Sequence, residues 1–460
     1  MQNFYLVLKT LFVGLYTILA AFSPALGGGD FAPSQPVKPG DTSMYLQVDA
    51  VDTGIEIYKP RYEGGSYRYG PSMILNTDGS LDIWCAAEGP GDFADMVSYA
   101  RLYRGGRCSS AEKVVLKPTG GGYDDLSTCD PGVIKFGGYY YIGYTTTLDN
   151  RGVDNDICIA RSKKPGGPYE KWTGSGWGAE PQPMIEFTDN PDWWGAGEPS
   201  FVLMGNKLYI YYSWNAPDST TRLAIADATD ENWPATLQYM GECIPAKSAG
   251  DSSDVKYVDA FGRFIAVFIK ERFTPDSYVA VWESFDGLHF RQSDIVKTNT
   301  AQNLHNCGIS GRADGHIGEG DPVYLGYSYG TWEDAGWATR LHEVRLSLSD
   351  TPKTDTAAEE NVAISPERRP VSAIPHVLTV KAEQQTYTIS KPTQVWILAY
   401  DTDGFVLPVL TGTCLYGYDR SVVRFIGGLM LPVNEGTTRV FFNWHGMTGD
   451  FLVHVNGSEP

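Results

Sequence analysis

Two short segments of this chain each place a carboxylate and a proline directly before an apolar strand. Asp130-Pro131 leads into residues 132–136 and a Gly-Gly turn, and Glu198-Pro199 leads into residues 200–204 and a second turn. Two carboxylic acids in one partly dry site can divide the work of breaking a glycosidic bond, one donating a proton and the other activating water. The repetition therefore predicts two structural units that each supply an acid to one shared site.

The same order of elements recurs along most of the chain. Units of three or four short strands, separated by turn residues, open near residues 70, 130, 198, 254 and 308. A period of this length, with several strands in each unit, is typical of propeller blades. Residues 44–349 are therefore predicted to form a five-bladed β-propeller. Within it, Ser284-Phe285-Asp286-Gly287 is predicted to be a tight turn.

The two ends of the chain differ from this pattern. Residues 1–27 contain Lys9, an apolar run over 10–22 and small residues near 25–27, which is the layout of a signal peptide, with an uncleaved anchor as the alternative. We expect a secreted or periplasmic protein with a linker at 28–43 and no membrane contact after cleavage. A polar linker at 350–374 precedes alternating strands over 375–460, which are predicted to be a β-sandwich. That domain could bind glycans or pack against the propeller.

Composition narrows the choice of partners. A net charge of −19 and a pI near 4.8 argue against binding to nucleic acid or to an anionic membrane. The seven cysteines contain no CxxC pair and no histidine at metal-ligand spacing, so neither a disulfide framework nor a structural zinc is expected. No cofactor is predicted, although a structural calcium on the axis stays open, and the sequence does not indicate an oligomeric state.

The geometry of a propeller decides which side chains meet. Its innermost strands run side by side around an axis, so the residues at their starts converge at one end of the channel. We expect Asp130, Glu198 and Asp254 there, with Glu88 and Trp214 at the ends of second strands. Carboxylates gathered in a partly dry funnel shift one another's pKa values, so that one can stay protonated near neutral pH.

Asp130-Pro131 and Glu198-Pro199, together with the blade period, resemble the five-bladed β-propeller glycoside hydrolases of families 43 and 32 and their relatives. The resemblance covers roughly residues 45–350. It implies that Asp130 tunes the pKa of the acid and orients substrate, and that Glu198 is the general acid. The family places an aspartate, its base or nucleophile, in blade one, where this chain has Gly70-Pro71-Ser72. Glu88 is the first substitute, although it also fits a solvated loop; Asp254, Asp95 and Asp124 follow.

Several residues are predicted to bind substrate rather than to react. Arg68 and Tyr69 adjoin the opening of blade one and could hold a sugar hydroxyl or carboxylate. Trp194 and Trp214 could stack on sugar rings, or be buried aromatic residues. His305 could donate a hydrogen bond to substrate or bind an axial ion, or be a structural histidine. Asp254 completes this set.

These observations predict an exported glycoside hydrolase that acts on a polysaccharide or oligosaccharide with inversion. The missing aspartate of blade one motivates the alternative, a noncatalytic glycan-binding propeller. A polysaccharide lyase is a third reading, since it would use a pair such as Arg68 and Tyr69 at a uronic-acid site.

Overall fold

The computed structural model describes residues 42–58, 67–88, 95–147, 152–246, 248–330, 336–354, 377–382, 386–389, 392–400, 406–407, 415–426, 429–444 and 447–457. These residues form an all-β protein, whose non-strand elements are the short 3-10 helices η1 (Trp233–Thr236) and η2 (Asp259–Phe261). No helix in the described ranges is long and apolar enough to cross a membrane. The segments predicted to be a signal peptide, and most of both predicted linkers, lie outside the described residues.

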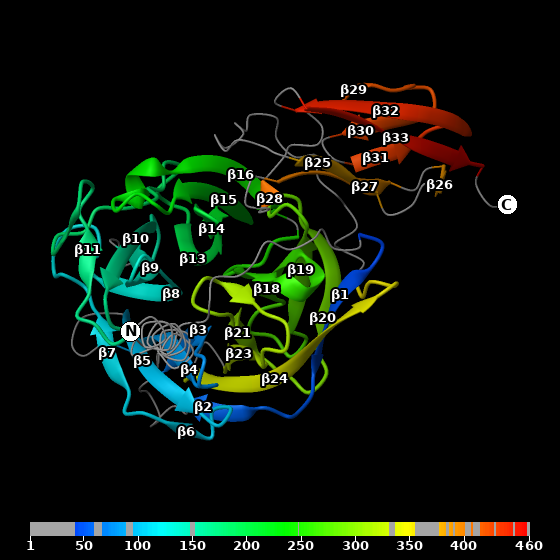
Figure 1. Cartoon of the computed structure of the whole chain (residues 1–460). Coiled ribbons are helices and arrows are strands. Elements are labelled where there is room, and N and C mark those ends of the chain that lie inside the picture. Colours follow the sequence, from blue (N-terminus) through cyan, green and yellow to red (C-terminus); the bar gives the residue numbers. More distant parts are fainter. Residues whose placement is uncertain are drawn as a thin grey trace, which may run out of the picture.

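Five mostly antiparallel sheets lie around a common centre (Figure 1). The first three contain, from the centre outwards, β3 (Arg68–Leu75), β4 (Leu81–Glu88), β5 (Asp95–Tyr103), β6 (Cys108–Ser109) and β7 (Lys113–Leu116); β8 (Ser127–Phe136), β9 (Tyr139–Thr147), β10 (Asp156–Ser162), β11 (Glu170–Trp172) and β12 (Trp177–Gly178); and β13 (Gly195–Met204), β14 (Lys207–Asn215), β15 (Ser219–Asp227) and β16 (Gln238–Ile244).

The fourth sheet contains β17 (Asp254–Val258), β18 (Arg263–Lys270), β19 (Tyr278–Ser284) and β20 (Arg291–Val296), with β22 (His316–Ile317) parallel to β17. The fifth contains β21 (Leu304–Ile309), β23 (Val323–Tyr329) and β24 (Ala338–Ser349), and it is completed by β1 (Tyr45–Ala50) and β2 (Ile55–Tyr58). The first strands of the described chain therefore pair with the last strand of the ring and close it.

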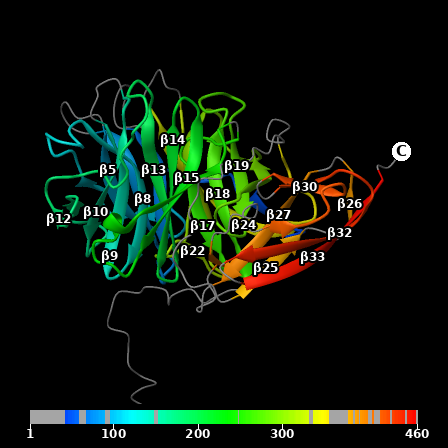
Figure 2. The ribbon, with the colours of Figure 1, turned by 90° about the horizontal axis from the view of Figure 1, so that it is seen from above.

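The C-terminal part of the chain forms two further sheets beside this ring (Figure 2). One contains β25 (Val377–Ala382), β27 (Thr393–Tyr400), β28 (Val406–Leu407), β30 (Val423–Ile426) and β31 (Leu429–Pro432), and the other contains β26 (Thr386–Thr388), β29 (Leu415–Gly417), β32 (Gly436–Trp444) and β33 (Met447–Asn456). They share a buried apolar cluster that includes Val395, Met430, Val440 and Val453. Leu398 is instead buried with residues of the third and fourth sheets of the ring.

Neighbouring innermost strands β3, β8, β13, β17 and β21 contact one another in sequence, and β21 contacts β3 again. Their approach is close. A Cβ on Gly132 would lie 1.7 Å from the Pro199 carbonyl oxygen, and one on Gly308 would lie 2.1 Å from the Pro71 carbonyl oxygen. At the same level Ser72, Ser200 and Asp254 each accept a hydrogen bond from the backbone N–H of the next strand, at 3.0, 2.8 and 2.8 Å. Small or hydrogen-bonding residues at this level thus set the width of the channel.

The connection between β21 and β23 crosses the other end of the channel. The carbonyl oxygens of Gly311, Ala313, Asp314 and Gly315 accept hydrogen bonds of 2.7 to 3.0 Å. The donors are backbone N–H groups near the ends of β3, β8, β13 and β17, respectively. His316 adds a side-chain bond of 2.7 Å between its Nε2 and the Leu203 carbonyl oxygen. We call residues 311–316 the axial strap, because they tie four strands to the fifth sheet and cover that end.

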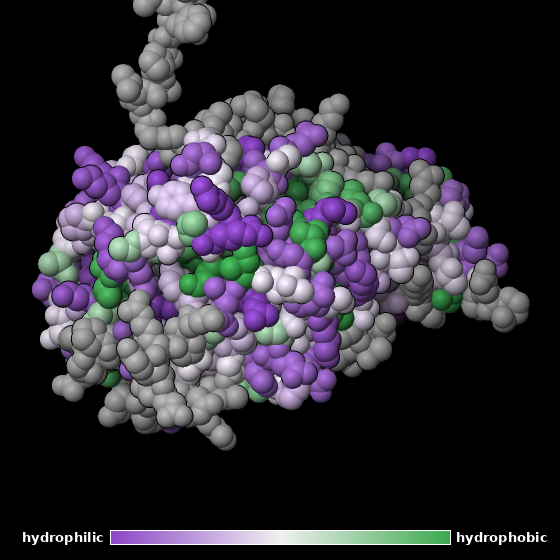
Figure 3. Space-filling model, turned by 90° about the horizontal axis from the view of Figure 1, so that it is seen from below, coloured by the Kyte–Doolittle hydropathy of each residue, from purple (hydrophilic) through white to green (hydrophobic). Residues whose placement is uncertain are grey.

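The face shown in Figure 3 is mostly polar, with apolar side chains gathered in patches on it. The predicted turn at Ser284-Phe285-Asp286-Gly287 is confirmed: Gly287 has φ of 73°, and Asp286 accepts hydrogen bonds from the backbone of Leu288 and His289 between β19 and β20. Cys85, Cys108, Cys129, Cys158 and Cys307 are free cysteines.

Candidate functional site

Asp130 and Glu198 occupy equivalent places near the starts of β8 and β13. Each sits in a β-bulge with a left-handed backbone, φ 46° for Asp130 and 55° for Glu198. Gly70 has the same conformation in β3 (φ 59°), as does Ser252 just before β17 (φ 63°). Left-handed backbone is costly for residues other than glycine and gathers at functional sites, where it aims a side chain. The bulges turn both carboxylates towards the channel.

Asn306 of β21 joins the two acids. Its Oδ1 accepts a hydrogen bond of 3.0 Å from Arg272, and because guanidinium groups only donate, this contact fixes the orientation of the amide. Its Nδ2 therefore faces Asp130 Oδ1 at 3.4 Å and Glu198 Oε1 at 3.3 Å. These two carboxylate oxygens are thus no more than about 6.7 Å apart.

The Glu198 carboxyl is held from the other side by Ser213 of β14. The Ser213 hydroxyl accepts a 3.1 Å hydrogen bond from the Ser252 backbone N–H, so its own proton is free to be donated to Glu198 Oε2, 2.9 Å away. The backbone N–H of Glu198 donates to Thr145 Oγ1 at 2.9 Å. Glu198 is only 5% exposed and Asp130 only 8%. Backbone and side chain of the acid are therefore both fixed.

A third carboxylate, Asp251, lies beside Glu198 and forms an ion pair with Arg272. Arg272 comes from the connection between β18 and β19, where Glu271 and Phe273 on either side have left-handed backbones (φ 52° and 62°). The Phe273 N–H donates to the Leu304 carbonyl oxygen at 3.0 Å, which fixes this turn against β21. Asp251 and Arg272 keep 18% and 22% of their side-chain surface exposed, so the cluster meets solvent at this pair.

The acids do not ionise alike. Burial raises the pKa of Glu198 well above its ordinary value, and the negative charge of Asp251 raises it further. Burial, then the charges of Asp251 and Asp95, raise the pKa of Asp130 to about 7. Burial opposes ionisation of Asp251 as well, but the charge of Arg272 and the hydrogen-bonding influence of Glu198 and Arg272 together lower the pKa of Asp251. The Glu198 carboxyl therefore keeps its proton to a higher pH than the Asp251 carboxyl does.

Aromatic rings form one wall of this cluster. The His305 ring lies 4.7 Å from Tyr69, 4.8 Å from Phe273 and 4.4 Å from Trp337, measured between ring centroids. Burial and the charge of Arg272 lower the pKa of His305, so it is neutral. Its Nδ1 is buried and has no hydrogen-bond partner in the described part of the chain.

The other predicted residues are dispersed. Glu88 is exposed at the end of β4, opposite the half-buried Asp95, which accepts a 2.6 Å hydrogen bond from Tyr67. Arg68 is bound by Glu112 at 2.5 and 2.8 Å, and Tyr69 is buried with its pKa raised by burial, which does not favour the pairing that a lyase would need.

Four further predicted positions contact neighbouring side chains or backbone groups. Trp194 covers Gly197, next to Glu198, because a Cβ there would lie 2.5 Å from the indole. Trp214 packs on Phe187 and under Arg222 in the third sheet. Asp254 lies one level below the acids and accepts hydrogen bonds from Ser200, Lys256 and the Ile309 N–H. Asp124, the last substitute considered, is bound by Lys171.

The sequence did not predict four residues of this cluster, which are Asp251, Arg272, Asn306 and Ser213. The first three sheets have a proline after the left-handed residue at this place, but the fourth has Ser252-Ser253 there. The expectation that Asp254 opens this sheet therefore overlooked Asp251, which directly precedes the left-handed Ser252. The remaining signal was the run Asp251-Ser252-Ser253-Asp254 itself, which offers two carboxylates at one opening.

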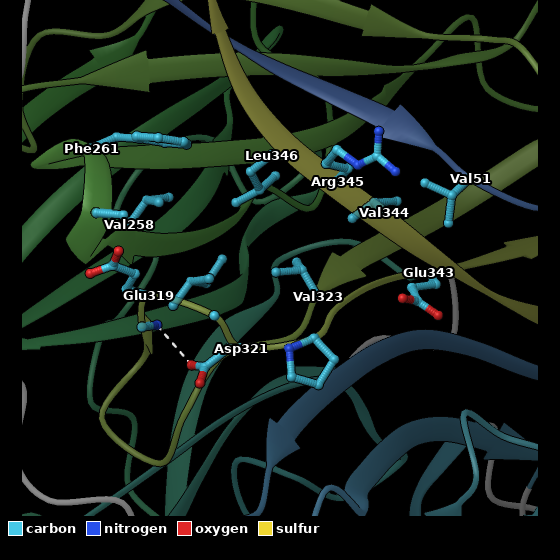
Figure 4. A pocket seen from close by; sticks show the side chains of 15 residues that line it. Val51, Val258, Phe261, Glu319, Asp321, Val323, Glu343, Val344, Arg345 and Leu346 are labelled. Atoms are coloured by element: carbon cyan, nitrogen blue, oxygen red, sulfur yellow. Dashed lines mark hydrogen bonds between the residues drawn. The ribbon is translucent and has the colours of Figure 1, made fainter.

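Two cavities differ in their chemistry. The one at the acids is water-sized, about 20 Å³, and is lined by Gly70, Asp130, Glu198, Asp254 and Cys307 among others. The larger one, about 330 Å³, lies near η2 and the strap end of the fifth sheet, with apolar walls and Glu319, Asp321, Glu343 and Arg345 at its edge (Figure 4). Within the described ranges, no three His, Cys, Asp or Glu side chains are grouped as metal ligands.

No family model matches the chain, and no curated protein matches its sequence. Solved structures do resemble it. A family 117 glycoside hydrolase from the marine bacterium Zobellia galactanivorans is 15% identical over 65% of this chain and 90% of its own, with a TM-score of 0.48. An α-L-arabinofuranosidase from Podospora anserina is 12% identical over 66% and 98%, with a TM-score of 0.45. A GH43_1 enzyme from Xanthomonas citri is 13% identical over 68% and 97%, with a TM-score of 0.45.

These neighbours are glycoside hydrolases. At such identities the likeness concerns the fold alone, so the chemistry has to be argued from the acids themselves.

Proposed function

We propose that this protein is an exported glycoside hydrolase whose five sheets are the blades of a β-propeller and whose C-terminal sheets form an accessory β-sandwich. Glu198 is the general acid. The observation that carries the proposal is the buried Glu198 carboxyl, which Ser213 and Asn306 hold beside the Asp251–Arg272 ion pair, where burial and the charge of Asp251 raise its pKa. A carboxylic acid protonated near neutral pH is what departure of a sugar oxygen requires. The partner is a carbohydrate, and no cofactor is needed for such a reaction.

The stereochemical course that we propose is inversion. It needs a base about 6.5–9.5 Å from the acid, whereas a nucleophile in a retaining enzyme lies about 5–5.5 Å away. Asp130, which shares an amide nitrogen with Glu198, falls at or below the near edge of the inverting range. We therefore assign the base to a carboxylate further out in the first blade, the exposed Glu88, with the half-buried Asp95 as the second candidate. Proton NMR of the first anomer released distinguishes the two courses.

Glu198→Gln is the direct test. The amide keeps the shape and the contacts of the side chain but has no proton to give, so hydrolysis should fall at least roughly 100-fold across every glycan that the wild type cleaves. Glu180→Gln, at an exposed glutamate, is the matched control and should leave the rate unchanged. Full activity of Glu198→Gln would remove Glu198 from the role of acid.

Gly70 supports one competing proposal, a noncatalytic glycan-binding propeller. It has the same backbone conformation as Asp130 and Glu198 but contributes no carboxylate. Calorimetric binding of an oligosaccharide by the wild type, without any product after prolonged incubation with a broad glycan panel, would favour this reading over hydrolysis.

A further inference from the structure

The ion pair between Asp251 and Arg272 has no part in the acid and base roles proposed above. Asp251 precedes β17 and Arg272 follows β18, so both come from the fourth sheet, whereas the two acids come from the second and third. Arg272 contacts Asp251 with Nη1 and Asn306 with Nη2. One guanidinium thus connects the third carboxylate with the amide that bridges the other two.

We propose that Asp251, held by Arg272, is the positioning residue that keeps the acidic proton on Glu198 by accepting it in a carboxyl–carboxylate hydrogen bond. This inference rests on the proposed function of Glu198 as the acid.

The contacts of Asp251 carry the argument. Its Oδ2 is occupied by Arg272, while its Oδ1 is buried and has no hydrogen-bond partner among the described residues. Two bridges bring it to the Glu198 carboxyl: Ser213 bonds both Glu198 and the N–H of Ser252, the residue after Asp251, and Arg272 bonds both Asp251 and Asn306. Two ionised carboxylates in this place would repel each other and leave a buried oxygen without a donor. A single proton on Glu198 resolves both costs.

Charge explains why the proton belongs to Glu198 and not to Asp251. The groups that act on Glu198 are Asp251, Asp130 and Arg272, and of these Arg272 is bonded to Asp251. Arg272 therefore stabilises the negative charge on Asp251, and Asp251 in turn disfavours one on Glu198. The charge of Asp130 also raises the pKa of Glu198, but by less than the charge of Asp251 does. When Glu198 gives its proton to the leaving oxygen, its new negative charge lies near that of Asp251, which favours reprotonation.

The test follows the Glu198 proton by infrared spectroscopy and needs no substrate. The carbonyl band of a protonated carboxylic acid that is present in wild type and absent in Glu198→Gln belongs to Glu198, and its loss with rising pH gives a midpoint. In Asp251→Asn the midpoint should fall by at least about one pH unit, because a like charge is removed and Arg272 faces Glu198 without its partner. In Arg272→Gln it should rise, because the pair retains its shared proton without the nearby cation.

Asp254→Asn is the matched control, since this carboxylate comes from the same opening but is bound to Lys256 and the Ile309 N–H. Its midpoint should equal that of the wild type. Opposite shifts in the two variants support the proposal; an unmoved midpoint in a folded Asp251→Asn, or shifts of the same sign, overturns it. If one variant does not fold, the direction of the other decides.

An enzyme that hydrolyses glycans but shows no such shift would refute the positioning role and leave the acid intact. A protein that hydrolyses no glycan but shows both midpoint shifts would support the interaction of Asp251 with the Glu198 proton and refute the role of Glu198 as an acid catalyst. Where a substrate is found, the alkaline limb of the pH–rate profile should move with the infrared midpoint.

Discussion

Asp130 should make the folded protein less stable as the pH rises, and Asp130→Asn should remove that loss. The carboxyl has an ordinary pKa of 3.8, and burial with the charges of Asp251 and Asp95 raises its pKa to about 7 in the fold. Between these values the folded chain binds a proton that the unfolded chain has released. Stability therefore falls as the pH rises from about 4 to about 7 and stays low above that range.

The size of this effect follows from the shift. Each pKa unit corresponds to about 1.4 kcal/mol, so a rise from 3.8 to about 7 corresponds to a penalty of about 4 kcal/mol, taken as a ceiling. Asparagine keeps the shape, tolerates the left-handed backbone at φ 46° and carries no charge. Asp130→Asn should therefore match the wild type in stability near pH 4 and exceed it by up to about 4 kcal/mol at pH 8.

Urea denaturation followed by tryptophan fluorescence at several pH values measures this difference. Asp254→Asn is the contrasting variant, since it removes the carboxylate that Lys256, Ser200 and the Ile309 N–H contact, and it should lose stability at pH 8. An Asp130→Asn protein that is no more stable than wild type at pH 8, with a difference that does not change with pH, would refute the electrostatic reasoning.

Two further predictions concern the channel. Gly132→Ala should destabilise the protein by about 3 kcal/mol or more, because its Cβ would lie 1.7 Å from the Pro199 carbonyl oxygen. Gly176 has open space around it, so Gly176→Ala should stay within about 0.5 kcal/mol of wild type in the same thermal melts. Equal melting temperatures of the two variants would contradict the close approach at Gly132. Burial lowers the pKa of His316, but the bond to Asp259, the charges of Asp314 and Asp259 and the bond to the Leu203 carbonyl oxygen together raise it. The contribution of His316 to stability should therefore be complete below about pH 6.5 and disappear as the pH rises through the folded value. His316→Gln should abolish that loss above about pH 6.5, and an unchanged pH dependence of its melting temperature would exclude this role.

The parts of the site that the sequence revealed are those marked by local chemistry. Proline after a carboxylate identified Asp130 and Glu198, because the same bulge recurs in their strands and the blade period places both at one end of the channel. The fourth sheet has the left-handed Ser252 at this place without a proline, so the sequence pattern indicated Asp254 instead of Asp251, the residue directly before Ser252. Asp254 instead belongs to the level where side chains bind the next strand, a level that Ser72 and Ser200 also occupy.

Arg272 and Asn306 could not be predicted, since their importance arises from contacts between sheets. Arg272 lies in a connection without a recognisable motif. The direction of its side chain depends on the left-handed backbones of Glu271 and Phe273, which a sequence without glycine at these positions does not predict. Asn306 matters because its Oδ1 accepts a hydrogen bond from Arg272, which leaves its Nδ2 to contact the two acids. Such a role depends on three elements that are far apart in the sequence.

The axial strap also bears on how this protein can be altered. Residues 311–316 lie between two strands, with two glycines, and by sequence they resemble a surface connection that would accept a tag, an insertion or new chain ends. Their carbonyl groups instead receive N–H groups from four separate sheets. An insertion there would release β3, β8, β13 and β17 together. New termini are better placed in the turn at Gly137-Gly138, where a Cβ would meet no other atom within 4 Å.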